Sequence, residues 1–273
     1  MVENFSVLMS THIRISKENL IESISSLVEQ TLKPSEIIIV KDGPLNFSLD
    51  EVCKLIDFKS FKIIHLKENK GLAYALNEGL KNCSFELIAR MDSDDISYPN
   101  RFEKQIAFMT HNVNLAVSSG VVEEFDENMK EKIFDKKVPT NSKKIISYAK
   151  RRNPINHPAA IFRKSIIKSL GGYPLLERGQ DYGLWSLLLK RNFEIGNLNV
   201  PLVKMRTGRE FYKRRGISFF KSEYELLKFQ KKIGFLTPFN FYINLFLRFT
   251  TRIANKDLKH FIYKLIRKID RKY

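Results

Sequence analysis

The 273-residue sequence has little cysteine and little glycine, and each shortage excludes a class of protein. Its two cysteines, Cys53 and Cys83, have no cysteine or histidine partner at metal-ligand spacing, so neither a zinc site nor a disulfide framework is predicted. No G-x-G-x-x-G stretch follows a predicted strand, which argues against a dinucleotide oxidoreductase. Residues 10–15, directly after the first predicted strand, contain no glycine, whereas a sugar-phosphate nucleotidyltransferase would carry its phosphate loop there.

Long apolar segments are also lacking. The first residues show no basic segment followed by an apolar one, so no leader peptide is predicted and a cytoplasmic protein is expected. The most aromatic stretch, residues 239–253, is interrupted by Arg248 and Arg252. It falls short of the roughly 20 apolar residues that a spanning helix needs, so we expect it to lie on a membrane rather than to cross one.

Positive charge is concentrated in the last quarter of the sequence. The net charge of +17 taken alone suggests a nucleic acid or an anionic surface as partner. Residues 204–273 hold 19 Lys and Arg against 5 Asp and Glu, which leaves 28 against 25 for residues 1–203. The near-neutral first part and the acidic cluster at 92–95 argue against a non-enzymatic nucleic-acid-binding protein, so no nucleic-acid partner is expected.

The first half of the sequence alternates short apolar runs with helical patterns. Strands are predicted at residues 5–9, 36–40, 61–66, 85–91 and 115–122. This alternation predicts βαβ units and a mostly parallel sheet flanked by helices. After residue 141 the pattern changes: helices are predicted near 145–150 and 181–190, and residues 218–270 read as helical and basic.

Polar residues follow three of the predicted strands at their carboxyl ends. They are Thr11 and His12 after the first strand, Asp42 after the second, and Asp92, Ser93 and Asp94 after the fourth. Ligands of open parallel sheets bind at this edge, so these side chains are expected to share one site. The D-x-D spacing suits Mg²⁺ or Mn²⁺, which take oxygen ligands and would offset the repulsion between the carboxylates.

Each of these candidates has a structural alternative. The acidic segment could cap the helix expected to begin near Pro99, through Asp95 or Ser97. Asp42-Gly43 could be a turn, and Lys70-Gly71 could be a helix-entry loop instead of a loop that contacts a nucleotide.

Further candidates lie in the second half. Asp181 is either the N-cap of a predicted helix or a general base that faces the site. His157 is a third metal ligand, a contact to phosphate or acceptor, or a loop histidine. The basic segment 204–216, which contains Arg206 and Arg214, is a solvated loop or one that closes over a diphosphate.

Several segments carry a resemblance through most of the chain: FSVLMSTH, QTLKPSEIIIVKDGP, ENKGLAYALNEGL, LIARMDSDDISYPNRFEKQ, RRNPINHPAAIFRKS, GGYPLLERGQDYGLW and YKRRG. Their order and spacing resemble the family 2 glycosyltransferases of the GT-A fold, in particular the amylovoran-biosynthesis and O-antigen type. The resemblance implies a Rossmann-like α/β catalytic domain at 1–216, with a nucleotide-binding half to about 125 and an acceptor-side half at 126–216. A basic helical C-terminal region would follow at 217–273.

The resemblance also implies an activity and its residues. The activity is metal-dependent, inverting transfer of a hexose or N-acetylhexosamine from a UDP-sugar to a lipid-linked saccharide, in bacterial exopolysaccharide, capsule or O-antigen synthesis. Asp181 would be the catalytic base, and Asp94 would hold Mn²⁺ or Mg²⁺, with His157 as a further candidate ligand. His157 and Trp185 would lie on the acceptor side. The nucleotide sugar would be contacted by Thr11, His12, Asp42, Lys70, Gly71, Asp92, Ser93, Arg206 and Arg214.

The sequence departs from the family pattern at two places. Thr11-His12-Ile13 stands where the family usually has proline, an aromatic residue and asparagine, and Gln180 precedes the base where an acidic residue is common. Because acceptors in this family are typically lipid-linked, the basic C-terminal region is expected to bind anionic headgroups at the inner face of the bacterial plasma membrane.

Overall fold

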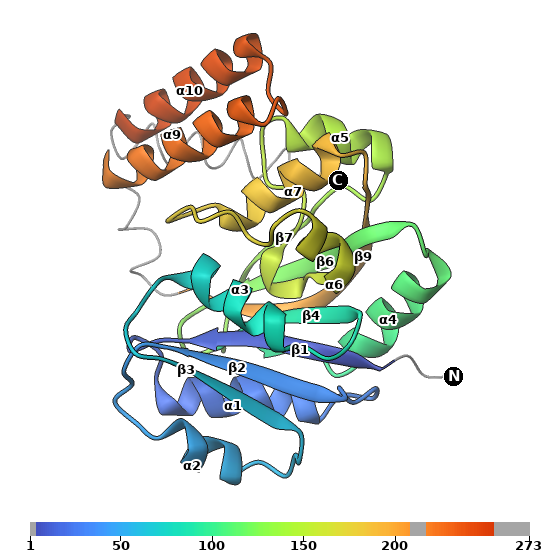
Figure 1. Cartoon of the computed structure of the whole chain (residues 1–273), viewed down its shortest axis with the longest axis vertical. Coiled ribbons are helices and arrows are strands. Elements are labelled where there is room, and N and C mark those ends of the chain that lie inside the picture. Colours follow the sequence, from blue (N-terminus) through green and yellow to red (C-terminus); the bar gives the residue numbers. More distant parts are fainter. Residues whose placement is uncertain (1–3, 208–216, 254–273) are drawn as a thin grey trace.

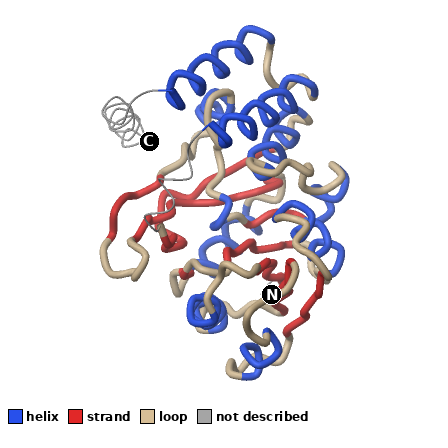
Figure 2. Tube along the Cα trace, turned by 90° about the vertical axis from the view of Figure 1, so that its left-hand side faces the viewer, coloured by secondary structure: helices blue, strands red, loops and turns tan. Residues whose placement is uncertain are grey.

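A computed structural model describes residues 4–207 and 217–253 of the chain (Figure 1). A central sheet carries helices on both faces. The helical hairpin of α9 (Ile217–Lys232) and α10 (Pro238–Ile253) stands at one end of the molecule, and β1 to β3 lie toward the other (Figures 1 and 2). Arg214 and the rest of the predicted basic loop at 208–216 lie outside the described residues.

The sheet is mixed but mostly parallel, as predicted. Its order is β3 (Phe61–Leu66), β2 (Glu36–Asp42), β1 (Phe5–Thr11), β4 (Leu87–Asp92), β8 (Ile161–Arg163), β6 (Leu115–Phe125), β9 (Glu194–Arg206) and β5 (Ile96–Ser97), with β7 (Lys132–Lys136) paired to β6. The strands β1 to β4 pair in parallel. Because β8 is antiparallel to both β4 and β6, β6 runs in the direction of β4, and β9 runs parallel to β6.

Most of the connecting helices fall close to the predicted positions, but the short helices at residues 49–54 and 164–169 were not predicted. The helices are α1 (Lys17–Val28), α2 (Leu49–Lys54), α3 (Leu72–Asn82), α4 (Arg101–His111), α5 (Ser142–Ala149), α6 (Lys164–Ser169) and α7 (Gln180–Lys190), with a short 3-10 helix η1 (His157–Ala159). The strands β5, β7, β8 and β9 were not predicted. All four belong to the half of the sheet that lies beyond β4.

Two predicted helix starts are wrong, and the corrections matter for the site. The helix α4 begins at Arg101 after its N-cap Asn100, so Pro99 precedes the first turn and neither Asp95 nor Ser97 caps this helix. The helix α7 has Gly179 as its N-cap, in the left-handed conformation with φ of +71°. Asp181 therefore lies inside the first turn and does not cap the helix.

Period-two alternation divides the core into two layers on the two faces of the sheet. Val7 and Met9 of β1 pack with residues of α1 and α4 on one face. Leu8 of the same strand packs with residues of α3 and α7 on the other. Parallel strands covered on both faces are typically continuous apolar runs, and β2 accordingly buries Ile37 through Val40 completely.

The helix α3 approaches the sheet at Gly79, where no side chain fits. A Cβ atom at this position would lie 2.2 Å from Leu8 Cδ1 and 2.9 Å from Val40 Cγ2. The close approach matters because the loop that leads into α3 carries two of the predicted nucleotide-site residues, Lys70 and Gly71.

We predict that Gly79→Val destabilises the protein, because the added atoms must displace Leu8 and Val40. Overpacking of this kind lowers the free energy of unfolding by about 1–3 kcal/mol, which urea denaturation measures. Lys81→Ala, on the exposed side of the same helix, is the control and should change it by about 0.5 kcal/mol or less. Equal stability of Gly79→Val and the unmodified protein would contradict the close packing.

Candidate active site

The carboxyl ends of β1, β2 and β4 meet at one edge of the sheet, as the sequence predicted. Ser10 pairs with both Val40 and Asp92, so the last residues of the three strands lie at the same level. Thr11 is buried there, and its hydroxyl group has no hydrogen-bond partner within the described ranges. His12 follows at the edge, half-buried, and its Nδ1 accepts the N–H of Arg14 at 3.3 Å.

Asp42 holds the loop that leads into α3. Its Oδ1 accepts the backbone N–H of Lys70 at 2.7 Å, and its Oδ2 accepts that of Gly71 at 3.0 Å. Gly71 has φ of +85°, a conformation that an L side chain rarely adopts. Three predicted nucleotide-site residues therefore lie together, with Asp42 fixing the loop that the other two occupy. The alternative of a helix-entry loop also fits, since Gly71 is the N-cap of α3.

The acidic loop after β4 is crowded and mostly buried. Ser93 and Asp95 are buried, and Asp92 is partly exposed. Burial, together with the charge of Asp92, raises the pKa of Asp94 to about 6. Burial and the charges of Asp92 and Asp94 raise the pKa of Asp95 well above its usual range. The loop thus holds more negative charge than the surrounding protein compensates.

This loop fits a hard divalent cation. Mg²⁺ and Mn²⁺ are commonly held by one or two carboxylates and complete their coordination with water and phosphate oxygens. Within residues 4–207 and 217–253, no three His, Cys, Asp or Glu side chains form a complete metal site by themselves. A cation at this loop would therefore need further oxygen ligands from water or from a phosphate group.

Arg206, predicted to contact the nucleotide, is bound to protein oxygens instead. Its backbone N–H donates to Asp95 Oδ1 at 2.9 Å, and its Nε donates to the carbonyl of Asp94 at 3.1 Å. Its Nη1 and Nη2 donate to the carbonyl of Glu127 and to the carboxylate of Glu22. All three guanidinium nitrogens are occupied, so in this arrangement Arg206 fastens the end of β9 to the acidic loop.

A cavity of about 400 Å³ joins the acidic loop to the candidate base. It is lined by residues from both halves of the sheet, among them Asp92 and Arg90 of β4, Lys136 of β7, His157 of η1, and Asp181 of α7. Asp92 and Asp181 are 89 positions apart in the sequence, and the fold brings both to one cavity. Both carboxylates therefore face the same cavity.

Asp181 is a partly buried carboxylate whose orientation is fixed by a hydrogen bond. Asn153 Nδ2 donates to its Oδ2 at 2.6 Å. Burial raises the pKa of Asp181, while hydrogen bonds from the backbone of Tyr182 and from Asn153, followed by the charges of Lys136 and Arg90, lower it. The net shift is upward, which makes this carboxylate a stronger base than an exposed one.

His157 lies in the wall of the cavity as a neutral imidazole. Its Nε2 lies 3.0 Å from the hydroxyl of Tyr173, and burial with the charges of Arg90 and Lys136 holds its pKa well below the usual range. Trp185 is 0% exposed and packs edge-on behind the His157 ring, at 6.2 Å between centroids. The prediction that Trp185 faces the acceptor is therefore corrected: it supports His157 from the core.

Tyr173 is fixed in turn by α3. The side chain of Asn77 accepts the Tyr173 N–H at 2.7 Å and donates to the Tyr173 carbonyl at 2.9 Å. Gly172, which precedes it, has φ of +83° and approaches Asn77 so closely that a Cβ would lie 2.4 Å from Oδ1. The helix that starts at the Lys70-Gly71 loop thus also positions the partner of His157.

Sequence reasoning missed two residues that line the cavity, Arg90 and Lys136, and two that contact its lining residues, Asn153 and Tyr173. For Arg90 a signal existed, because a charged residue in an otherwise apolar strand needs a partner. The other three lie on β7 and on irregular segments, where the local pattern does not show which way a side chain points. Their positions follow from the tertiary fold.

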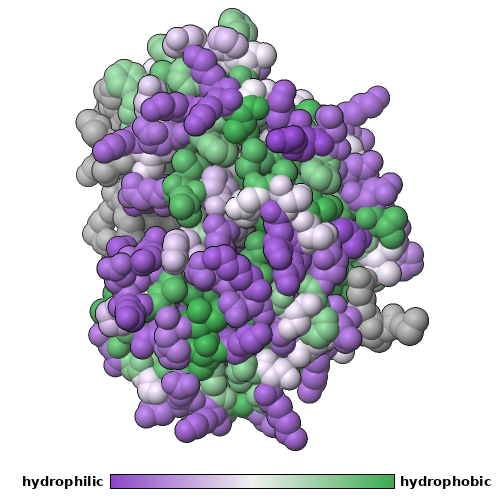
Figure 3. Space-filling view, viewed as in Figure 1, coloured by the Kyte–Doolittle hydropathy of each residue, from purple (hydrophilic) through white to green (hydrophobic). Residues whose placement is uncertain are grey.

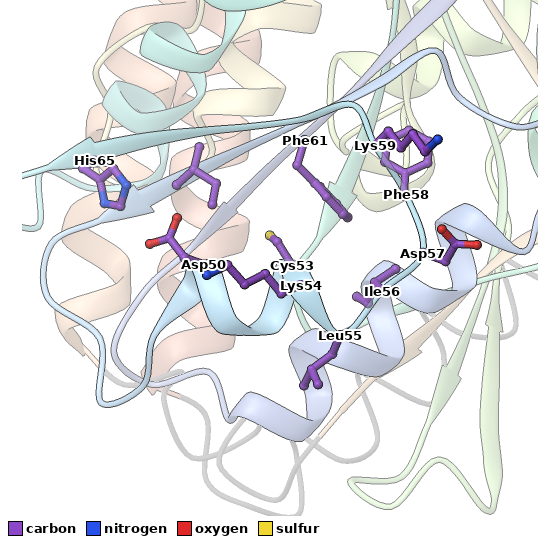
Figure 4. Close-up of a pocket in the computed structure, with 11 residues that line it drawn as sticks. Asp50, Cys53, Lys54, Leu55, Ile56, Asp57, Phe58, Lys59, Phe61 and His65 are labelled. Carbon is purple, nitrogen blue, oxygen red and sulfur yellow. The ribbon is translucent and has the colours of Figure 1, made fainter.

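A second depression, of about 730 Å³, lies at the outer edge of the sheet between α2 and β3 (Figure 4). Apolar and mixed side chains surround it, including Cys53, Phe61 and His65, and Asp50 and Asp57 stand apart in the view. Burial raises the pKa of Cys53 to about 11, so its thiol stays protonated at neutral pH. These features do not suit the binding of a metal-bound diphosphate, and the cavity lined by Asp92 and Asp181 is the better candidate for the active site.

Comparison with known proteins assigns the chain to a family. The profile of Glycosyl transferase family 2 matches residues 6–171, which include the acidic loop and His157. The chain belongs to glycosyltransferase family 2. Membership makes the protein a glycosyltransferase, which removes the nucleotidyltransferase alternative and the non-enzymatic one.

Two relatives of this family match nearly the whole chain. The amylovoran biosynthesis glycosyltransferase AmsE of Erwinia amylovora is 36% identical over 97% of this chain and 99% of its own. An Escherichia coli UDP-Gal:alpha-D-GlcNAc-diphosphoundecaprenol beta-1,3-galactosyltransferase is 37% identical over 96% of each chain. The S. aureus TarS 1-349 structure in complex with UDP has a TM-score of 0.63 at 17% identity, over 94% of this chain and 74% of that one. This likeness shows the shared fold, which is the predicted GT-A type.

We predict that Arg206→Met loosens the acidic loop. Loss of the guanidinium hydrogen bonds should lower the free energy of unfolding by about 2 kcal/mol, measured by urea denaturation. Lys204→Met, two residues earlier on the same strand, removes a cation that lies over the rings of Tyr98 and Phe125, and should lower it less. Unchanged stability together with weakened UDP binding would show instead that Arg206 contacts the nucleotide directly.

Proposed function

We propose that the protein transfers a hexose or N-acetylhexosamine from a UDP-sugar to a hydroxyl group of a lipid-linked saccharide during synthesis of a bacterial surface polysaccharide. The observation that carries the proposal is the cavity that is lined both by Asp92, beside the acidic loop, and by the partly buried base candidate Asp181. The names of the two full-length relatives support the donor, the acceptor class and the pathway class.

On the acceptor side, Asp181 takes the proton of the attacking hydroxyl. The side chain of Asn153 keeps the carboxylate in one orientation, and burial increases its basicity. The new glycosidic bond forms as the bond from the sugar to UDP breaks, and the proton remains on Asp181 until solvent removes it. Attack on the face opposite the departing diphosphate inverts the anomeric centre. His157, neutral and held by Tyr173, lines the wall beside the reacting groups.

On the donor side, the ends of β1, β2 and β4 bind the nucleotide. Thr11 offers a buried hydroxyl that has no partner among the described residues, and the loop of Lys70 and Gly71 is held in place by Asp42. Asp92 contacts the ribose, and Asp94 with its neighbouring carboxylates would hold Mn²⁺ or Mg²⁺. When bound, such a cation stabilises negative charge on the leaving diphosphate. Because His157 Nε2 faces Tyr173, a metal-ligand role of His157 would fall to its Nδ1.

We predict metal-dependent release of UDP from one or more UDP-sugars, abolished in Asp94→Ala and lowered by at least 10³-fold in Asp181→Asn. Because the pKa of Asp181 is raised, kcat/KM should fall as the pH drops through that raised value, where the base becomes protonated and loses its function. A coupled UDP-release assay across pH measures both effects.

The matched control for these variants is Asp50→Asn, which removes a carboxylate from the depression at the sheet edge and should leave turnover unchanged. If Asp94→Ala and Asp181→Asn both turn over as fast as the unmodified protein, the assignment of the active site fails.

We further infer that α10 attaches the enzyme to an anionic membrane, where a lipid-linked acceptor would be presented. Phe239, Tyr242, Phe246 and Phe249 are exposed and follow helical spacing along one side, whereas Phe241 packs inward on α9. Apolar atoms show among hydrophilic ones over this hairpin at the top of Figure 3. The surrounding sequence carries most of the net positive charge. No described helix has the length and apolar character of a membrane span.

We predict that the full-length protein floats with liposomes containing phosphatidylglycerol and that flotation decreases strongly when Phe239, Tyr242 and Phe246 are replaced by serine. These side chains lose the apolar area that would insert at the headgroup boundary. Serine at Leu55 and Val113, exposed apolar residues of the catalytic domain, is the control and should leave flotation unchanged. Equal flotation of both variants would place the membrane contact elsewhere.

A further inference from the structure

Arg90 is a buried cation beneath the active-site cavity. It lies on β4, where period-two alternation places its side chain on the same face as Ile88 and Asp92 and opposite Ala89 and Met91. Only 2% of its surface is exposed. An arginine in such a place is energetically unfavourable unless its charge and its N–H groups are used.

The protein satisfies only part of the Arg90 guanidinium. Its Nη2 pairs with Asp92 Oδ1. Its Nε and Nη1 are buried and have no hydrogen-bond partner within the described residues. The residue also lines the cavity that Asp92, His157 and Asp181 share. The two guanidinium nitrogens without a partner therefore belong to a residue that lies where the donor-side and acceptor-side groups meet.

The neighbouring Arg101 provides a contrast. It is 0% exposed and lies on the opposite side of β4, where its Nη2 donates to the Arg90 carbonyl at 2.7 Å. Its Nε donates to Gln105 Oε1 at 3.0 Å, and its Nη1 approaches Met91 Sδ at 3.2 Å. The Arg101 guanidinium is fully engaged by the protein and does not line the cavity, as expected of an arginine that supports the strand.

We propose that Arg90 is a positioning residue of the transfer reaction, which fixes the Asp92 carboxylate for the donor and places one positive charge between the donor-side and acceptor-side groups. The inference rests on the proposed function. The pairing with Asp92 restricts a carboxylate that is otherwise repelled by its acidic neighbours. The same positive charge lies at the cavity that Asp181 and His157 also line. It favours the ionised form of Asp181 and the neutral form of His157.

The groups around Asp181 support this assignment. Charges and dipoles reach it from four elements: Arg90 and Asp92 of β4, Lys136 of β7, His157 of η1, and the segment around α7, with Glu177, Arg178 and the Tyr182 N–H. Asn153 and Tyr173 complete the surroundings. Lys136 and Arg90 are the cations that lower the pKa of Asp181. Removing Arg90 should therefore raise that pKa and move the acid limb of the pH profile to higher pH.

The test compares Arg90→Met, Arg90→Lys and Arg101→Met in the full-length protein. We expect Arg90→Met to lower kcat/KM at neutral pH by roughly 10- to 100-fold and to shift the acid limb upward. Arg90→Lys should keep the acid limb of the unmodified protein, because the positive charge remains. It should raise KM for the UDP-sugar, because a lysine ammonium does not reproduce the planar guanidinium and its fixed N–H donors. Arg101→Met should lower the unfolding temperature without moving the acid limb.

Two results would overturn the inference. One is an Arg90→Met variant whose acid limb does not move. Its loss of activity would then be explained by its lowered unfolding temperature alone, as for Arg101→Met. The other, decisive where Arg90→Met does not fold, is an Arg90→Lys variant with the KM of the unmodified protein.

Calorimetry of UDP binding with Mn²⁺ separates this inference from the proposed function. Weaker UDP binding by Arg90→Lys supports the positioning role even if no UDP-sugar is turned over, and equal binding opposes it. An unmodified protein that turns over no UDP-sugar would defeat the proposed function alone.

Discussion

The repulsion among the carboxylates of the loop after β4 is the constraint on which the rest of the site depends. Three aspartates in four positions at the end of a buried strand cannot all be ionised without compensation, and the raised pKa values of Asp94 and Asp95 show that the protein compensates them only in part. Arg90 pairs with the first aspartate, and the backbone of Arg206 holds the last. The remaining charge is available to a cation.

This constraint explains why distant parts of the chain converge on one loop. The strand β9 ends at Arg206, whose guanidinium bonds to the loop carbonyl of Asp94. The helix α4 begins with Arg101, which binds the carbonyl of Arg90 below the loop. Arg206 thus donates hydrogen bonds to the acidic segment itself, and Arg101 supports the strand that precedes it.

The donor half of the molecule could be predicted from the sequence because its signals are local. Apolar runs with turn residues between them give β1 to β4, and the polar residues at the strand ends follow directly from the parallel arrangement. The acceptor half could not be predicted to the same degree. The strand β8 has three residues, and β9 contains Pro201 and polar positions, so neither shows a clear period. Their pairing is decided by tertiary contacts.

The same division applies to individual residues. Asp42, Asp92 and Asp181 are found in short motifs, and the structure brings Asp92 and Asp181 to one cavity. Asn153, which orients Asp181, has no local signal, because the contact joins an irregular segment to a helix 28 positions later. Trp185 was wrongly predicted to face the acceptor, because helical periodicity identifies the buried face of α7 but not which residues pack against that face. A pattern in sequence gives the direction of a side chain relative to its own element, and a site requires its direction relative to other elements.

The double hydrogen bond from Asn77 to the backbone of Tyr173 has a consequence for how this fold diversifies. The helix α3 starts at the loop fastened by Asp42 and, two turns later, fixes the residue that holds His157. A change in length or sequence at that loop would rotate or shift the helix and carry Tyr173 with it. The Lys70-Gly71 loop and the Tyr173–His157 pair therefore depend on the same helix. A chimaera that exchanges only one of them between two relatives would combine a loop and a cavity wall whose packing is not matched.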